Sequence, residues 1–189
     1  MYLLLDTETT SYHPGQIAQL SYIHLDKDRK IIDSKNYFFA VDEMDPYAEA
    51  IHWFSKERLE ILSEGKRFAD YEHEILPLLE TTTLVAHNVW FDLKFMQYEC
   101  KRVWYDYQPE TLCTMKHFTP ICQLPSPQKP WLLKRPKVAE LIAHYNISEE
   151  NISDTTKEIF KETDIWFHDA RYDTVAVYLA MKAYHGVIN

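Results

Sequence analysis

Two carboxylates at the end of a short apolar run constrain this chain most strongly. Leu3–Asp6 is typical of a short buried strand, and Asp6 and Glu8 stand at its end, two residues apart. Side chains alternate between the faces of a strand, so Asp6 and Glu8 point the same way. Two adjacent anions repel unless they are solvated, one is protonated, or a cation lies between them. The pair therefore favours a cation site at a strand end, although this D-x-E spacing alone is common on exposed surfaces.

The rest of the pattern predicts a mixed α/β sheet with helices packed against it. Gln16–Leu25 and Lys30–Val41 resemble strands, and the tight polar turn Asp26–Arg29 between them requires an antiparallel pair. Thr83–Ala86 is expected to be a further strand. The expected helices are Pro46–Ile51, Lys56–Leu62 after the N-cap Ser55, Phe68–Leu79, one capped by Asn88, and a last one that begins at His168 or Asp169 and ends at Gly186. Residues 1–189 are thus predicted to form one domain.

Composition excludes several classes of protein. The 189 residues can bury an apolar core without disulfides. The three cysteines lack C-x-x-C spacing, and a zinc site at Cys113, His117 and Cys122 is less favoured than reduced, buried thiols. No apolar run approaches the roughly 20 residues of a membrane-spanning helix. The amino-terminal run has no basic flank, so no signal peptide and a cytoplasmic location are expected.

The net charge of −9 argues against broad electrostatic binding of nucleic acid. Carboxylates balanced by divalent cations would be locally neutral, so the overall charge does not exclude a phosphate substrate bound through metal ions.

One segment departs from this acidic character. Residues 119–136 hold five of the nine prolines, which predicts a loop or lobe within the domain. Between Thr119 and Lys137 there is no acidic residue, and the basic and aromatic residues there are Lys129, Trp131, Lys134, Arg135 and Lys137. We expect either contacts to a nucleic-acid strand or a solvated connector.

Two further carboxylates lie near helix starts. Asp92 falls in the first turn after Thr83–Ala86, where it is either a metal ligand or a partner of the helix dipole. Asp173 follows His168 by five residues, which on a helix would place them roughly 140° apart. We therefore place Asp173 in the helix and His168 on the approach to it, where it suits a general base; alternatively His168 only caps the helix.

Taken together, these segments resemble the motifs of the DEDDh branch of the DnaQ-like 3′–5′ exonucleases, in the RNase H-like superfamily. The first motif corresponds to Leu4–Thr10, the second to His87–Asp92 and the third to His168–Asp173, in the family's order across nearly the whole chain. The H-x4-D spacing separates this branch from the tyrosine branch. Weaker matches are Ala50–His52 and a helix over Lys137–Tyr145.

The chain departs from the family at a few positions. Ser11 and Trp53 stand where glycines are usual, and Arg171-Tyr172 is bulkier than the common sequence. These departures remove no ligand, but they bear on the fit of the substrate.

The resemblance implies an RNase H-like fold with a five-stranded mixed sheet. It also implies that Asp6, Glu8, Asp92 and Asp173 hold two Mg²⁺ or Mn²⁺ ions, which suit carboxylate ligands. Asp6 would bridge the ions, with Glu8 and Asp173 completing the first and Asp92 holding the second mainly through water. His168 would activate the attacking water, and nucleoside 5′-monophosphates would leave from the 3′ end of DNA.

The residues expected to hold the terminal nucleotide surround these motifs. They are Thr7, Thr9, Thr10, Ile51, His52, Phe54, Asn88 and Phe91. Phe54 and Phe91 are equally consistent with core positions.

Three alternatives remain on sequence grounds. The chain could be an exoribonuclease or oligonucleotidase of the same branch, or a catalytically silent nucleic-acid-binding module; a Ca²⁺-binding domain lacks an EF-hand-like loop. Since the sequence stops at Asn189, soon after the last helix, we expect no polymerase-tethering tail and a stand-alone enzyme, with a homodimer as one option.

Overall fold

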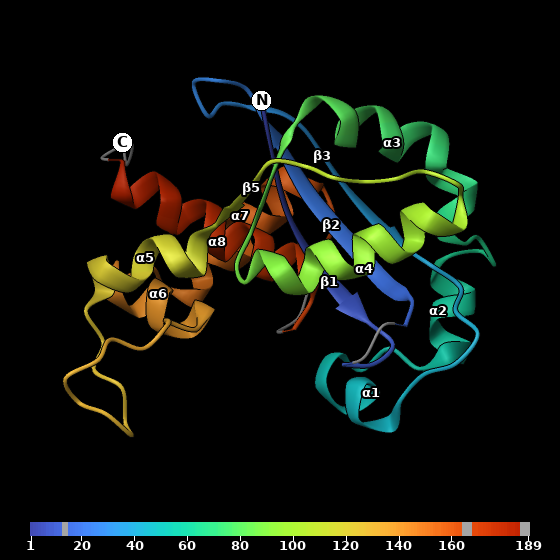
Figure 1. The fold of residues 1–189 in the computed structure, drawn as a ribbon. Helices are drawn as coiled ribbons and strands as arrows, with labels where there is room; N and C mark the ends of the chain where they lie inside the picture. Colours follow the sequence, from blue (N-terminus) through green and yellow to red (C-terminus); the bar gives the residue numbers. More distant parts are fainter. Residues whose placement is uncertain (13–14, 164–167, 186–189) are drawn as a thin grey trace.

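A five-stranded mixed sheet forms the centre of the molecule (Figure 1). The computed structural model describes residues 1–12, 15–163 and 168–185. The sheet has the order β3-β2-β1-β4-β5, and its strands are β1 Tyr2–Thr9, β2 Ile17–Leu25, β3 Ile31–Phe38, β4 Thr83–Ala86 and β5 Thr111–Cys113. The first three strands are antiparallel, whereas β4 pairs parallel with both β1 and β5. The carboxyl ends of β1, β4 and β5 therefore meet at one edge.

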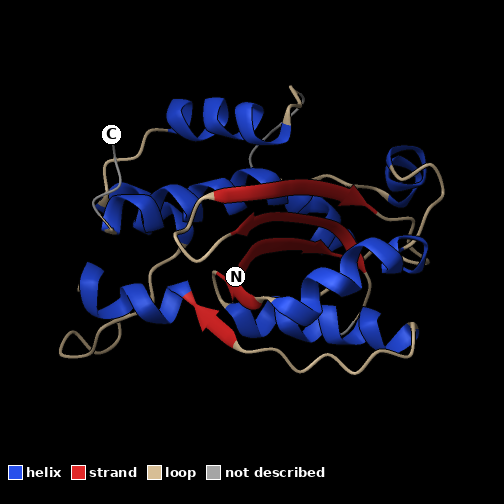
Figure 2. Cartoon of the chain, turned by 90° about the horizontal axis from the view of Figure 1, so that it is seen from above, coloured by secondary structure: helices blue, strands red, loops and turns tan. Residues whose placement is uncertain are grey.

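Helices cover both faces of this sheet (Figure 2). They are α1 Pro46–His52, α2 Lys56–Leu62, the 3-10 turn η1 Phe68–Tyr71, α3 Glu72–Thr81, α4 Val89–Arg102, α5 Thr114–Cys122, α6 Val138–His144, α7 Glu149–Phe160 and α8 Ala170–Tyr184. Leu3 and Leu5 share a core with α3 and α4, while Leu4 shares the opposite core with α7 and α8. Because β1 is buried on both faces, its position is fixed by packing.

Most expected elements are confirmed, with corrections at their ends. β1 runs through Asp6 and Glu8 to Thr9 instead of stopping at Asp6, and β3 ends at Phe38 instead of Val41. The helix expected over Phe68–Leu79 is wrong in its first turn, which is a separate 3-10 turn before α3. β5, α5 and α7 were not anticipated, because β5 is only three residues long, α5 contains a proline, and polar residues fill most of the first two turns of α7. Gly186 lies outside the described residues.

The proline-rich segment is more ordered than its composition predicts. Its first residues, Thr119–Cys122, form the last turn of α5, with Pro120 inside that helix, so the prediction of irregular structure there is wrong. Pro120 lacks an N–H to donate, and it stands near the end of a nine-residue helix, where the loss of one bond affects little of the helix. From Gln123 to Lys137 the chain is a connection without a regular helix or strand.

All three thiols are free, with Cys100 and Cys122 buried. In the described ranges, no cluster suited to a metal involves Cys113, and no helix combines the length and hydropathy needed to cross a bilayer.

Trp53 ends α1 in a conformation that normally favours glycine. Its φ is 62° and ψ 22°, in the left-handed region, and its N–H donates to the carbonyl oxygen of Glu49 at 2.7 Å. A side chain with a Cβ pays about 1–2 kcal/mol there. A glycine adopts this conformation without strain. The Trp53 side chain is 65% exposed, so packing does not offset the cost.

Trp53→Gly should therefore stabilise the protein. We expect a gain of about 1 kcal/mol and a rise in Tm of about 3 °C, because glycine adopts this backbone conformation without strain. Thermal unfolding followed by circular dichroism measures it. Trp53→Ala, which removes the ring but keeps the Cβ, is the control and should show no such gain. Equal gains in both variants would trace the effect to the ring and contradict the backbone explanation.

Candidate active site

Three carboxylates converge on the face of β1 that looks toward α8. Asp6 and Glu8 share the parity of Leu4, whose side chain packs in the core formed with α8, and Asp173 lies in the first turn of that helix. One oxygen from each of the three lies within 4.8 Å of the others. All three side chains are half-buried. The period of a strand and the start of one helix thus bring together residues that are more than 160 positions apart.

Asp92 reaches the same edge from the other side of β1. It lies in the first turn of α4 and is only 2% exposed. The Thr7 hydroxyl, which points to the opposite face from Asp6, donates to Asp92 Oδ1 at 2.9 Å. The Asp92 charge contributes to the raised pKa of Asp6, so the two carboxylates are electrostatically close.

Burial and mutual repulsion make these groups weak acids in the absence of a cation. Burial, then the charges of Asp92 and Asp173, raise the pKa of Asp6 well above its usual range. Glu8 shows the same direction from burial and Asp173. Burial raises the pKa of Asp92 to about 7, and burial and Asp169 do the same for Asp173. An all-oxygen donor set that is short of positive charge fits hard divalent cations such as Mg²⁺ or Mn²⁺.

A buried polar network fixes the start of α8, and sequence reasoning did not find it. Asp169 is fully buried and caps the helix by accepting from the N–H of Arg171 at 2.9 Å. The Arg171 guanidinium, 2% exposed, donates to both Asp169 oxygens, at 2.8 and 2.6 Å. Gln19 of β2 donates to Asp169 at 3.0 Å and accepts from the N–H of Ala170 at 3.0 Å. The bulky Arg171 is therefore the counter-ion of Asp169, and the network holds Asp173 opposite β1.

His168 lies outside the helix, as the spacing predicts. Its φ is 58°, it precedes the N-cap Asp169, and its side chain is exposed. The helix cap is thus Asp169, and the alternative in which His168 caps α8 is excluded by this geometry. Partial burial lowers the pKa of His168 below its usual value, which favours the neutral imidazole that a general base needs.

The threonines in β1 and just after it form hydrogen bonds within the fold. Thr7, Thr9 and Thr10 are buried, and the Thr9 hydroxyl donates to the Ser11 carbonyl oxygen at 3.0 Å. Thr10 Oγ1 accepts from the N–H of Gln16 at 3.0 Å. Their hydroxyls therefore already have partners, and Thr7 supports Asp92 directly.

Phe54 does not lie on a substrate surface. It is fully buried, and its ring contacts Phe38 edge-on at 5.2 Å and stacks on His52 at 5.3 Å, so the expectation of a base contact is wrong. His52 is 2% exposed, and its Nδ1 accepts from the N–H of Phe54. Its Nε2 therefore carries the proton and donates to the Thr9 carbonyl oxygen at 3.2 Å. His52 thus joins α1 to the end of β1.

Other expected contacts lie at or near the surface. Ile51 is 41% exposed, while Phe91 and Asn88 are half-buried. Asn88 precedes α4 at φ 75° and makes no side-chain capping bond, so the expected cap is correct in position and wrong in its hydrogen bond.

Exposed aromatic rings near these motifs escaped sequence reasoning. Tyr12 is 79% exposed and its ring lies 6.1 Å from that of Phe91; Trp90, beside Phe91, is 63% exposed. Their position directly after the first motif and within the second was the available signal.

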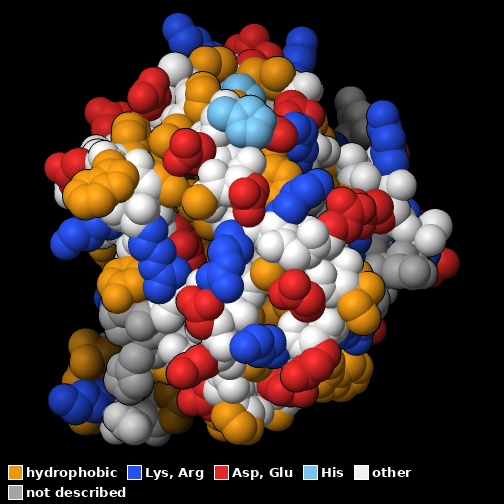
Figure 3. All heavy atoms as spheres, turned by 90° about the vertical axis from the view of Figure 1, so that its right-hand side faces the viewer, with side chains coloured by type: hydrophobic (Ala, Val, Ile, Leu, Met, Phe, Trp, Pro, Cys, Tyr) orange, Lys and Arg blue, Asp and Glu red, His pale blue; other side chains and the backbone are white. Residues whose placement is uncertain are grey.

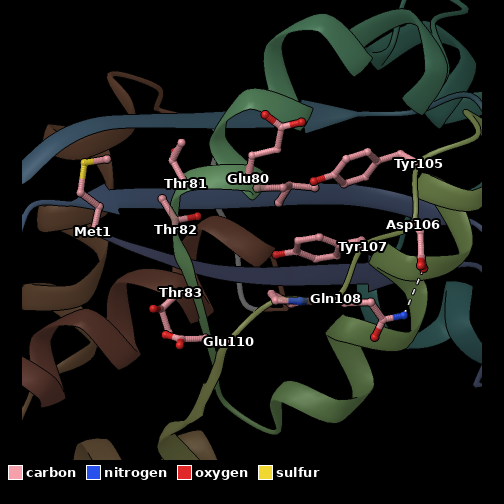
Figure 4. Close-up of a pocket in the computed structure, with 12 residues that line it drawn as sticks. Met1, Glu80, Thr81, Thr82, Thr83, Tyr105, Asp106, Tyr107, Gln108 and Glu110 are labelled. Atoms are coloured by element: carbon pink, nitrogen blue, oxygen red, sulfur yellow. Dashed lines mark hydrogen bonds between the residues drawn. The ribbon is translucent and has the colours of Figure 1, made fainter.

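Two cavities flank opposite ends of β1. A cavity of about 540 Å³ adjoins the carboxylate end and is lined by Thr10, Ser11 and the residues before α1. Another of about 490 Å³ lies at the amino ends of β1 and β4, between Met1, Thr83 and the loop 105–110 (Figure 4). The second is therefore remote from the carboxylates.

The fold and the carboxylates define a class of protein, and the match to a family model defines the family. A mixed α/β sheet with carboxylates at the end of its central strand is the arrangement of the RNase H-like nucleases. The chain matches the family model described as Exonuclease, RNase T, over residues 3–180. It therefore belongs to this family of DnaQ-like exonucleases.

Relatives and solved structures agree with this assignment. DNA polymerase III subunit epsilon of Rickettsia prowazekii (strain Madrid E) is 32% identical over 103 residues, 51% of this chain and 43% of that protein. E. coli exonuclease I in complex with a dT13 oligonucleotide has a TM-score of 0.74 at 18% identity, covering 97% of this chain and 40% of that one. Exonuclease X with 5′-overhanging duplex DNA has a TM-score of 0.56 at 19% identity, covering 100% and 95%. The chain thus matches less than half the length of the epsilon subunits and of exonuclease I, and the structural likenesses establish an RNase H-like fold.

The raised pKa values predict how stability depends on pH. Between about pH 4 and about pH 7 the folded, metal-free protein binds more protons than the unfolded chain, so its free energy of unfolding falls as pH rises. Asp173→Asn should therefore lose less stability than wild type between about pH 5 and about pH 8, measured by Tm in EDTA.

The matched control is Asp154→Asn, an exposed carboxylate paired with Lys157, which should follow wild type. Adding Mg²⁺ at the upper pH should raise the Tm of wild type and the control, but that of Asp173→Asn much less. Parallel pH curves for wild type and Asp173→Asn would refute the repulsion.

Proposed function

We propose that this chain is a divalent-cation-dependent 3′–5′ exonuclease that hydrolyses DNA from its 3′ end, at single-stranded or frayed termini, to nucleoside 5′-monophosphates. The observation that carries the proposal is the convergence of Asp6, Glu8 and Asp173 within 4.8 Å, next to the buried Asp92. Membership of the exonuclease family supports the reaction. The DNA named for exonuclease I and exonuclease X supports the substrate. Residues 1–189 would act as one domain.

The four carboxylates divide into two groups in this proposal. Asp6, Glu8 and Asp173 would hold one Mg²⁺ or Mn²⁺, and Asp6 with Asp92 would hold a second. When bound, such ions supply positive charge to the attacking and leaving oxygens of a phosphodiester. Thr7 orients Asp92, while Gln19 and Arg171 orient the start of α8 and so Asp173.

His168 would act as the general base. Its neutral imidazole would remove the proton from the attacking water as the oxygen approaches phosphorus. The bond between phosphorus and the 3′ oxygen of the remaining strand would break on the opposite side, that oxygen would take up a proton from solvent, and the terminal nucleoside would leave with its 5′-phosphate. The exposed position before α8 would let the imidazole meet the end of a substrate, and the cap at Asp169 fixes the start of the helix that carries Asp173.

The terminal nucleotide would lie against the exposed residues around this edge. Ile51, Phe91 and Tyr12 offer apolar and aromatic surface, and Trp53 and Trp90 extend it. Stacking on such rings contributes about 1–3 kcal/mol per base and tolerates any sequence.

The direct test is digestion of 5′-labelled oligonucleotides. Wild type with Mg²⁺ or Mn²⁺ should shorten single-stranded DNA from its 3′ end and release nucleoside 5′-monophosphates, and EDTA should abolish this. Asp6→Asn should lose at least about 10³-fold in rate, because the ligand shared by both groups is removed. Asp154→Asn is the active control. Faster digestion of a matched RNA would reassign the substrate, and inactivity on both would remove the proposal.

His168→Ala separates the base from the metal ligands. We expect kcat to fall by about 10²–10⁴-fold, because proton removal is lost, while the rise in Tm caused by Mn²⁺ remains. His144→Ala, which changes a histidine on α6, should behave as wild type. An active His168→Ala variant, or one that no longer responds to Mn²⁺, would contradict the role.

A further inference from the structure

The basic, proline-rich connection forms a hairpin-like arm, residues 124–135, which leaves the body of the molecule beyond α5 and α6 (Figure 1). Pro125 and Leu133 form an antiparallel bridge. The N–H of Ser126 donates to the Leu132 carbonyl oxygen at 2.8 Å, and the N–H of Lys134 to the Leu124 carbonyl oxygen at 2.9 Å. The N–H of Leu132 closes the tip on the Lys129 carbonyl oxygen at 2.8 Å. The arm is therefore built by its own backbone bonds.

The base of the arm is attached to the catalytic edge. His87 follows β4 directly, and its Nε2 lies 2.9 Å from the Pro136 carbonyl oxygen while its Nδ1 lies 3.1 Å from Thr114 Oγ1. His87 also precedes Asn88 and α4, which carries Asp92. Lys134 pairs with Glu140 of α6. These contacts place the root of the arm next to the second motif.

The arm concentrates positive charge and apolar surface in an acidic protein. Trp131 is 78% exposed, and Leu132 and Leu133 are about half exposed. Lys129 and Arg135 are exposed and form no ion pair among the described residues. Elsewhere positive and negative side chains alternate, as on the face in Figure 3, and Lys66 and Arg67, for example, pair with carboxylates.

The ion pair with Glu140 corrects one expectation. The Lys134 ammonium group pairs with the Glu140 carboxylate at the root of the arm, so a direct phosphate contact from Lys134 is disfavoured. Lys129, Trp131 and Arg135 remain as the surface that can meet a ligand.

We propose that this arm grips the single strand upstream of the scissile phosphate, with Trp131 stacked on a base and Lys129 and Arg135 against phosphates. The chemistry favours a polynucleotide, since it pairs a flat aromatic ring with cations whose charge the protein leaves available. The root of the arm lies beside the second motif, whose Asp92 belongs to the carboxylate edge. This proposal rests on the proposed exonuclease function and adds a second contact, away from the 3′ end.

The test compares a substrate that fills only the active site with one that reaches the arm. The first is p-nitrophenyl thymidine 5′-monophosphate, and the second a long oligothymidylate. Trp131→Ala should leave kcat/KM for the ester unchanged and lower that for the oligonucleotide about 5- to 100-fold. Trp104→Ala is the matched control, because Trp104 is 97% exposed and lies outside the arm. It should leave both values unchanged.

Charge removal gives a second, independent readout. The double variant Lys129→Gln/Arg135→Gln should weaken binding of fluorescein-labelled oligothymidylate, followed by anisotropy with Ca²⁺ in place of Mg²⁺. The slope of log K against log salt should fall by about one for each lost phosphate contact. Lys157→Gln, on α7, is the control.

Each outcome decides the matter. Equal losses on the ester and the oligonucleotide would show that the arm supports the active site only, and no loss on either would remove the arm from substrate binding. If wild type hydrolysed neither substrate, the exonuclease proposal would fail. The anisotropy measurement would still test whether the arm binds the oligonucleotide. If Trp131→Ala released the protein from anionic vesicles while oligonucleotide binding stayed unchanged, the arm would be a membrane contact and the proposal overturned.

Discussion

Repulsion among the half-buried carboxylates at the end of β1 is the constraint to which the rest of the structure responds. Asp6, Glu8 and Asp173 meet within 4.8 Å, and burial makes each a weaker acid. Such a cluster opposes folding, so other interactions must fix its position. The central strand provides them, because Leu3 and Leu5 pack on one face and Leu4 on the other. The apolar core on both sides of β1 therefore holds the acids together until cations offset their charge.

Some carboxylates of the site have hydrogen-bonding or ionic partners within the protein, whereas others have no basic partner among the described residues. Asp169 receives the Arg171 guanidinium and the Gln19 amide, and Asp92 receives the Thr7 hydroxyl. These bonds orient the start of α8 and the first turn of α4. In contrast, no lysine or arginine among the described residues forms an ion pair with Asp6, Glu8 or Asp173. The cations of a metal site would therefore meet oriented ligands whose charge has not been neutralised by the protein.

The parts of the site set by local geometry could be predicted, and the parts set by distant contacts could not. Strand alternation placed Asp6 and Glu8 on one face, and helix geometry separated His168 from Asp173. Gln19 and Asp169 are 150 residues apart, and no local sequence pattern in either segment predicts the hydrogen bond between them. The expected contact between Phe54 and a base was not met for a similar reason, because its neighbours Phe38 and His52 come together only in the folded chain. The turn at Phe68–Tyr71 has an apolar pattern that a helix and a 3-10 turn share.

Net charge also means less than its distribution. With a net charge of −9, the chain repels a polyanion at long range, so binding must rely on short-range contacts. Two proposed sources of such contacts are separated in space. The carboxylate edge would draw the scissile phosphate through divalent cations, and the arm offers Lys129 and Arg135, which form no ion pair among the described residues. Because the root of the arm is bonded to His87, beside the second motif, both would act on one strand. An acidic protein can therefore hold a nucleic acid if its positive charge is placed along the path of the strand.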